Sequence, residues 1–137
     1  AFAALPAFAA AQGAPRPDDA RLYIVNLADG DTVSSPVTVV FGLSGMGVAP
    51  AGTEVENTGH HHLMLNRPPL GEGEYGDEEF TLALPSDENH RHFGGGQTEA
   101  ILDLQPGEHT LQLVLADWGH VPHDPPLVSE RITITVE

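Results

Sequence analysis

Short runs of alternating apolar and polar residues follow one another along the chain from residue 21 onward, with Gly, Pro, Asn and Asp between the runs. In the last run, Ile132, Ile134 and Val136 fall on one face of an extended segment, as a half-buried strand requires. No stretch has a helical period, and there is no internal repeat. We therefore predict an all-β fold, a seven-stranded immunoglobulin-like antiparallel β-sandwich. Its strands are expected at residues 21–27, 37–43, 61–66, 79–84, 98–104, 109–116 and 128–136.

The first 20 residues differ from the rest and are predicted to form an extended N-terminal tail before a sandwich domain at residues 21–137. Residues 1–12 are uncharged and contain Ala-x-Ala patterns, and residues 12–20 form a Pro-rich linker. Such an apolar segment is typical of the end of a secretory signal, which predicts export to the periplasm or the cell exterior. Alternatively, the tail is a donor strand that pairs with a sheet edge of another copy and builds a homopolymer. Residues 1–12 are too few for a membrane span, which needs about 20 apolar residues.

Composition narrows the classes of partner. The 137 residues suit one domain with one core. Only 5 Lys and Arg oppose 20 Asp and Glu, which gives a net charge of -15. Such a surface repels nucleic acid and anionic lipid, so we expect neither as a partner. Because the chain has no cysteine, disulfides, thiolate metal sites and thiol nucleophiles are excluded.

Seven of the eight histidines fall into three short clusters. Because successive antiparallel strands alternate in direction, the three loops that carry or border these clusters should emerge at the same end of the sandwich. The remaining histidine, His109, should lie at the opposite end and serves as an internal control. Imidazole is the commonest metal ligand among side chains, so we predict a metal site formed by the clustered histidines. The candidate ligands are His60, His61, His62, His90, His92, His120 and His123.

Local spacing refines this set. Alternation in a strand places His61 on the core side, whereas His60, His62 and Met64 share the opposite face. The segment around His90 and His92 can present two rings to one ion if it is extended, and the glycines at 94–96 let backbone pack closely beneath the site. Seven histidines exceed the three or four that one ion uses. Either some of them support the ligands, or two ions bind.

The donor set narrows the choice of metal. An all-nitrogen set suits Cu(II), Zn(II) or Ni(II), and copper forms the strongest complexes in this series. We therefore favour copper over zinc as the cofactor. Met64 is a soft donor that suits Cu(I), but a methionine in a strand more often serves packing alone.

Four segments together resemble a known bacterial family. They are GHHHL at 59–63, DENHRHFGGGQT at 87–98, PGEHTLQL at 106–113 and HVPHDPP at 120–126. The chain is similar to the domain of unknown function DUF4399 over residues 26–136. The resemblance implies a preceding signal peptide, and therefore export, but it implies no activity.

Three functions are compatible with these features. The first is an exported, non-enzymatic metal-binding module. The second is a structural subunit of an extracellular filament, assembled by donor-strand pairing and binding metal within the fibre. The third is a copper-dependent redox enzyme. The sequence has no His-Glu-x-x-His motif, no assignable Ser-His-Asp arrangement and no phosphate-binding glycine loop. We therefore favour the first function and assign no catalytic residue.

Overall fold

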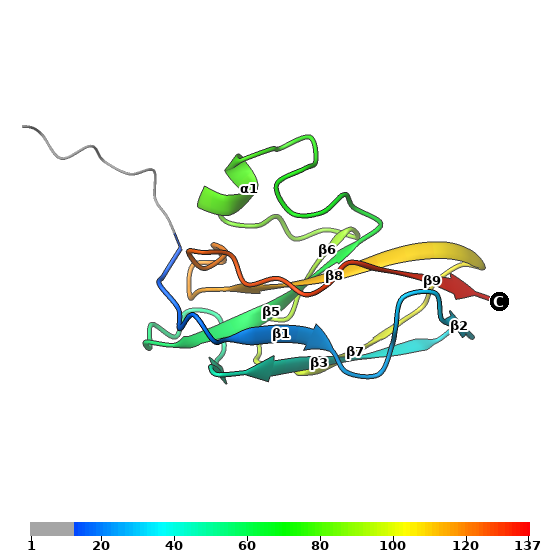
Figure 1. The fold of residues 1–137 in the computed structure, drawn as a ribbon, viewed down its shortest axis with the longest axis horizontal. Helices are drawn as coiled ribbons and strands as arrows, with labels where there is room; N and C mark the ends of the chain where they lie inside the picture. Colours follow the sequence, from blue (N-terminus) through cyan, green and yellow to red (C-terminus); the bar gives the residue numbers. More distant parts are fainter. Residues whose placement is uncertain (1–12) are drawn as a thin grey trace, which may run out of the picture.

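In the computed structural model, residues 13–137 form two β-sheets that pack face to face, with one short helix outside them (Figure 1). The signal and donor-strand predictions for residues 1–12 lie outside the described residues. Within residues 13–137, no helix is both long and apolar enough to cross a membrane.

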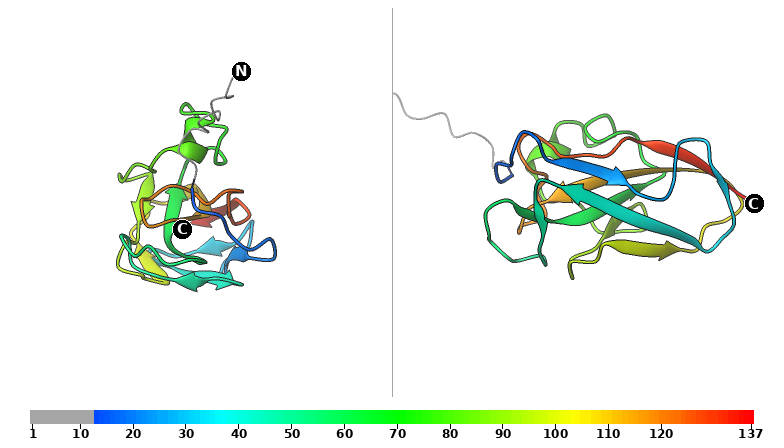
Figure 2. Two further views of the ribbon diagram at one scale, coloured as in Figure 1. Left: turned by 90° about the vertical axis from the view of Figure 1, so that its left-hand side faces the viewer. Right: turned by 60° about the horizontal axis from the view of Figure 1, so that its bottom comes forward.

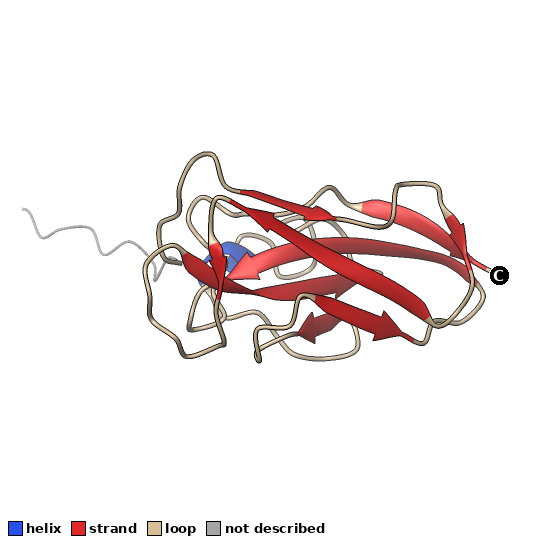
Figure 3. Ribbon diagram, turned by 90° about the horizontal axis from the view of Figure 1, so that it is seen from below, coloured by secondary structure: helices blue, strands red, loops and turns tan. Residues whose placement is uncertain are grey.

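The smaller sheet has three antiparallel strands in the order β1-β3-β7, namely β1 (Arg21–Ile24), β3 (Val37–Ser44) and β7 (Glu99–Leu102). The larger sheet has the order β2-β9-β8-β5-β4, and β6 pairs with β5 as well. Its strands are β2 (Thr32–Val33), β4 (Gly47–Val48), β5 (Thr58–Leu65), β6 (His90–His92), β8 (Gly107–Ala116) and β9 (Ile132–Val136). Figures 2 and 3 show the two layers from an end and from below.

The main core lies between the two sheets. Alternate residues of each strand point into it, including Val39 of β3, Leu63 of β5, Leu113 of β8 and Ile134 of β9, all 0% exposed. This inward stripe is the apolar half of the alternation in the sequence. The burial of this stripe holds the sheets together and fixes which side chains of β5 and β8 point away from the core.

The outer face of the larger sheet is also partly covered. Residues 66–89 leave the sheet after β5, form helix α1 (Glu78–Thr81) above it and return to β6 (Figure 1). A small apolar cluster lies beneath this excursion, comprising Met64, Leu70, Leu84, Val114 and Ala116. Both faces of β5 are therefore buried, which explains why seven of its eight residues are buried.

Several predictions about the elements need correction. The strand expected at residues 79–84 is wrong: this segment holds α1, where the Leu82 N–H donates to the Glu78 carbonyl. The Leu84 N–H donates to the carbonyl of His120 in another loop, so the segment joins no ladder. Residues 13–137 contain nine strands rather than seven, because one predicted strand is absent and three short strands, β2, β4 and β6, are added. The β2–β9 and β4–β5 pairs are parallel, so the larger sheet is mixed rather than antiparallel.

The mostly β, two-sheet architecture is confirmed. The immunoglobulin-like topology and the domain boundary at residue 20 stay predictions. Residues 13–16, assigned to the tail, lie against the loop after β8, where Ala14 and Asp124 are joined by a backbone hydrogen bond of 3.0 Å.

Candidate metal centre

Four of the seven candidate histidines converge. His60 and His62 come from β5, His92 from β6, and His120 from the loop after β8. One ring nitrogen of each lies within 4.8 Å of those of the other three. The His62 Nε2 atom is 2.8 Å from His60 Nε2, which is 3.1 Å from His120 Nδ1. We call this set the four-histidine cluster.

Strand geometry explains the convergence. The alternation of β5 points His60 and His62 away from the main core, on the face predicted from the sequence. The antiparallel register pairs His62 with His92, which places the β6 imidazole beside the β5 pair. His60 pairs with Ala116 at the end of β8. The next loop therefore starts beside the cluster, and His120 turns back toward it with a positive φ of 66°.

The cluster lies partly inside the protein and partly at its surface. His60 and His62 are buried, His120 is half-buried and His92 is exposed. A β-carbon at position 94 would be 2.4 Å from the His92 ring. Glycine at this position therefore lets the backbone lie close to the His92 ring, as expected from the glycine run.

The environment favours the neutral form of three of these imidazoles. Burial, together with neighbouring imidazoles, lowers the pKa of His60 to about 4 and that of His62 to about 2. Burial, followed by the proximity of His120, also lowers the pKa of His92. Neutral imidazole offers the lone pair that a metal ion requires. His60, His62 and His92 are therefore in their metal-binding form at neutral pH.

The hydrogen-bonding capacity of the cluster fits a cation. A neutral imidazole carries one N–H and one lone pair, on different nitrogens. His60 Nε2 nevertheless faces ring nitrogens of both His62 and His120, and one nitrogen cannot satisfy both with one proton or one lone pair. A metal ion at the centre accepts a lone pair from each ring. The Nδ1 atoms of His60 and His62 would then carry the protons, although they have no partner among the described residues.

The remaining three candidates lie outside the cluster. His61 points into the main core, as predicted, with its ring 4.9 Å from that of Phe41. Burial lowers its pKa to about 4. His123 is 1% exposed, and its two ring nitrogens face the carbonyl oxygens of Leu115 and Thr58 at 3.4 and 3.2 Å.

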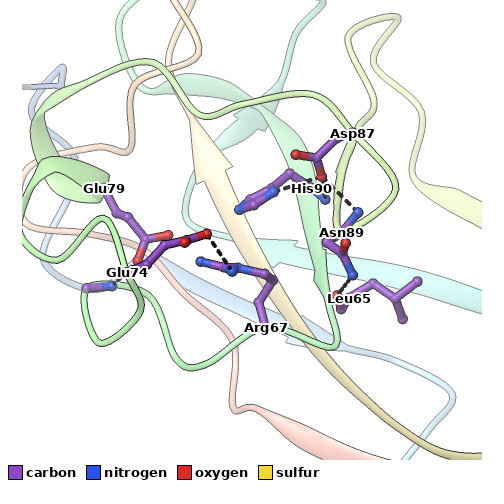
Figure 4. A network of polar contacts seen from close by, with 8 residues as sticks. Leu65, Arg67, Glu74, Glu79, Asp87, Asn89 and His90 are labelled. Carbon is purple, nitrogen blue, oxygen red and sulfur yellow. Dashed lines mark hydrogen bonds and ion pairs between the residues drawn. The ribbon is translucent and has the colours of Figure 1, made fainter.

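His90 belongs to a separate polar network beneath α1 (Figure 4). Its Nδ1 is 2.9 Å from Oδ1 of Asp87, and this hydrogen bond is the main reason that the pKa of Asp87 is lowered. An ion pair of 3.4 Å between Arg67 and Glu74 lies in the same region and shares no residue with these contacts. His90 lies opposite Met64 in the register, two pairs further along β5 than His92.

Comparison with protein families shows to which family the chain belongs. The model of the domain of unknown function DUF4399 matches residues 39–137. The chain belongs to the DUF4399 family. Comparisons with curated proteins and with solved structures found no match. The matched part of the DUF4399 domain includes all four cluster histidines.

One residue that the sequence analysis did not single out lies close to the cluster. Asp117 of the DUF4399 domain is 6% exposed, and its proximity opposes the larger effect of burial, which lowers the pKa of His60. Its carboxylate accepts hydrogen bonds from the backbone of its own loop, at Gly119 and Val121. An Asp that begins a loop, two residues before a glycine, is a known turn signal, but this signal does not indicate that the turn holds a histidine of the cluster.

His90→Ala should leave metal uptake by the DUF4399 domain unchanged, because His90 bonds to Asp87 rather than to the cluster. His92→Ala, two residues along the same strand, should weaken it strongly. Isothermal titration of both variants with Cu(II) measures the difference. Equal losses would place His90 in the centre, as the sequence predicted.

Proposed function

We propose that this domain is an exported, non-enzymatic module that binds a transition metal, with copper favoured over zinc. The observation that carries the proposal is the convergence of four ring nitrogens, from His60, His62, His92 and His120, within 4.8 Å of one another. Four imidazoles from three separate segments form a complete donor set for one ion.

The spacing of the nitrogens is compatible with both copper and zinc. Metal–nitrogen bonds of about 2.0 Å put tetrahedral ligands, as around zinc, about 3.3 Å apart. The same bonds in the tetragonal plane that Cu(II) prefers put neighbouring nitrogens about 2.8 Å apart. Of the two separations at His60, 2.8 Å matches the tetragonal value and 3.1 Å lies between the two values. Copper is favoured because nitrogen sites bind it more tightly than zinc.

A binding role is favoured over catalysis by the way in which the Asp117 carboxylate is held. Asp117 accepts backbone hydrogen bonds on both oxygens, from Gly119 and Val121 on Oδ1 and from Ala14 on Oδ2. A carboxylate held in this way is poorly placed to move protons to or from a substrate. Export rests on the apolar, uncharged composition of residues 1–12.

The proposal is tested by titrating metal-free protein with Cu(II) and Zn(II). We expect uptake of one equivalent, with copper bound more tightly. His62→Ala and His120→Ala should each weaken uptake more than about 100-fold, because loss of a supporting partner alone costs about 10–100-fold. His109→Ala is the matched control, because His109 bonds to Asn66 and Gln105 at the far end of β8. Equal losses in all three variants would contradict the proposed centre.

A further inference from the structure

We propose that Asp117 is a positioning residue for the four-histidine cluster. Its carboxylate fixes the loop that presents His120 and ties this loop to residues 13–16. This inference rests on the proposed function, because it concerns how the same centre is held.

The loop after β8 closes around the Asp117 side chain. Oδ1 accepts hydrogen bonds from the N–H groups of Gly119 at 2.9 Å and Val121 at 3.1 Å. The backbone of Asp117 closes the same turn: its N–H donates to the Val121 carbonyl at 2.8 Å, and its carbonyl accepts from the His120 N–H at 3.0 Å. Four hydrogen bonds therefore hold residues 117–121 in one shape.

This shape matters because His120 has an unfavourable backbone conformation. Its φ of 66° lies in the left-handed region, which a residue other than glycine occupies only where its surroundings enforce it. The same conformation places His120 Nδ1 3.1 Å from His60 Nε2. Without the Asp117 carboxylate, the turn would lose two of its bonds and His120 would be free to rotate away from the cluster.

The Asp117 carboxylate also favours the binding of a cation in the four-histidine cluster. Asp117 is 6% exposed, and its Oδ1 accepts hydrogen bonds from the N–H groups on either side of His120, those of Gly119 and Val121. A buried negative charge beside a cation site stabilises the cation, because the protein interior screens charges weakly. Asp117 therefore acts on the centre without being one of the four ligands.

The second oxygen connects the loop to the start of the described chain. Oδ2 accepts a hydrogen bond of 3.0 Å from the N–H of Ala14. The Ala14 carbonyl accepts from Asp124 N–H at 3.0 Å, and the Arg16 guanidinium donates to the carbonyls of Pro125 and Pro126 at 2.8 and 3.1 Å. We call residues 13–16 the strap.

Glycine is required at the first position of the strap. A β-carbon at Gly13 would be 1.7 Å from the Pro122 carbonyl oxygen, so a larger residue must displace the strap from the loop. Gly13→Val therefore removes the strap's contact with Asp117 without altering any histidine. It provides a second, independent way to disturb the positioning.

The test compares Cu(II) affinity and the electron paramagnetic resonance spectrum of Cu(II) in the full chain and its variants. Asp117→Asn should lower affinity about 10–100-fold, the usual effect of losing a group that orients a ligand. Its spectrum should shift toward that of His120→Ala, in which one nitrogen ligand is missing. Gly13→Val should shift the spectrum in the same direction. Asp124→Asn, which removes an equal charge from an exposed position of the same loop, should match the wild type.

The outcomes are distinguishable. A folded Asp117→Asn protein with the wild-type spectrum and affinity would overturn the positioning role and leave the proposed function standing. A purely structural role would lower the melting temperature but leave the spectrum of the folded protein unchanged, and so also counts against the proposal. If Asp117→Asn does not fold, Gly13→Val decides between the same outcomes. No copper uptake by the wild type would refute the proposed function itself.

Discussion

Metal-free protein is expected to lose most of its stability as the pH falls from 6.5 toward 4, and bound copper is expected to oppose this loss. The cause is a group of buried neutral histidines. Burial is the largest cause that lowers the pKa of His60 and His61 from 6.5 to about 4 and that of His62 to about 2. Their rings are at most 2% exposed.

The direction of the effect follows from proton linkage. Below pH 6.5 the unfolded chain binds protons that the folded chain excludes until about pH 4. Acidification therefore favours unfolding, and the stability present above pH 6.5 is lost as the pH falls through the folded-state pKa. For His61 alone the loss is roughly 3 kcal/mol, since one pKa unit is worth about 1.4 kcal/mol. A small domain has only about 5–15 kcal/mol of stability in total.

Urea unfolding followed by circular dichroism at pH 7.5, 6 and 5 measures this loss. Copper at about 100 times its dissociation constant should add about 2.7 kcal/mol to the free energy of unfolding, because it binds the folded state alone. His109→Ala should retain the wild-type pH dependence. A free energy of unfolding that does not change between pH 7.5 and 5 would refute the prediction.

The period-two alternation was sufficient to predict the main strands, because burial against a core requires that pattern. The alternation misplaced residues 79–84, where Phe80 and Leu84 pack on the outer face of the larger sheet and the segment joins no ladder. The strands β2, β4 and β6 have only two or three residues each. Elements this short are set by the neighbouring strand rather than by their own sequence, so no local pattern could reveal them.

The sequence predicted a cluster of histidines, but one of the strands used to place them together does not form. The three histidine clusters were predicted on or beside loops at one end of the sandwich, and this prediction counted a fourth strand that does not form. In the structure, His60 and His62 lie within β5 itself, and His92 reaches them through strand pairing in β6. Alternation along β5 correctly separated His61 from its two neighbours. In each of the other two pairs, His90 with His92 and His120 with His123, one histidine joins the cluster and one does not. The choice depends on the long-range strand register and on the turn at Asp117. Neither can be read from the spacing of histidines along the sequence.

Replacement of His61 by leucine is expected to stabilise the protein and to leave copper binding intact. His61 is 0% exposed and packs against Phe41. Both of its ring nitrogens lack a hydrogen-bond partner within residues 13–137. A buried polar atom without a partner costs about 1–3 kcal/mol. Leucine has a similar volume and no polar atom, so His61→Leu should raise the free energy of unfolding by about 1–3 kcal/mol at pH 7.5.

His123→Leu is the matched control for this substitution. His123 is buried to the same degree, but its ring nitrogens face the carbonyl oxygens of Leu115 and Thr58. Leucine at 123 would leave a buried carbonyl without a donor and should destabilise the protein by about 1–3 kcal/mol. Urea unfolding gives both values, and copper titration of His61→Leu gives the second readout. If His61→Leu lowered the copper affinity as far as His62→Ala does, His61 would be one of the ligands. A core histidine that does not bind the metal should not change the copper affinity to that extent.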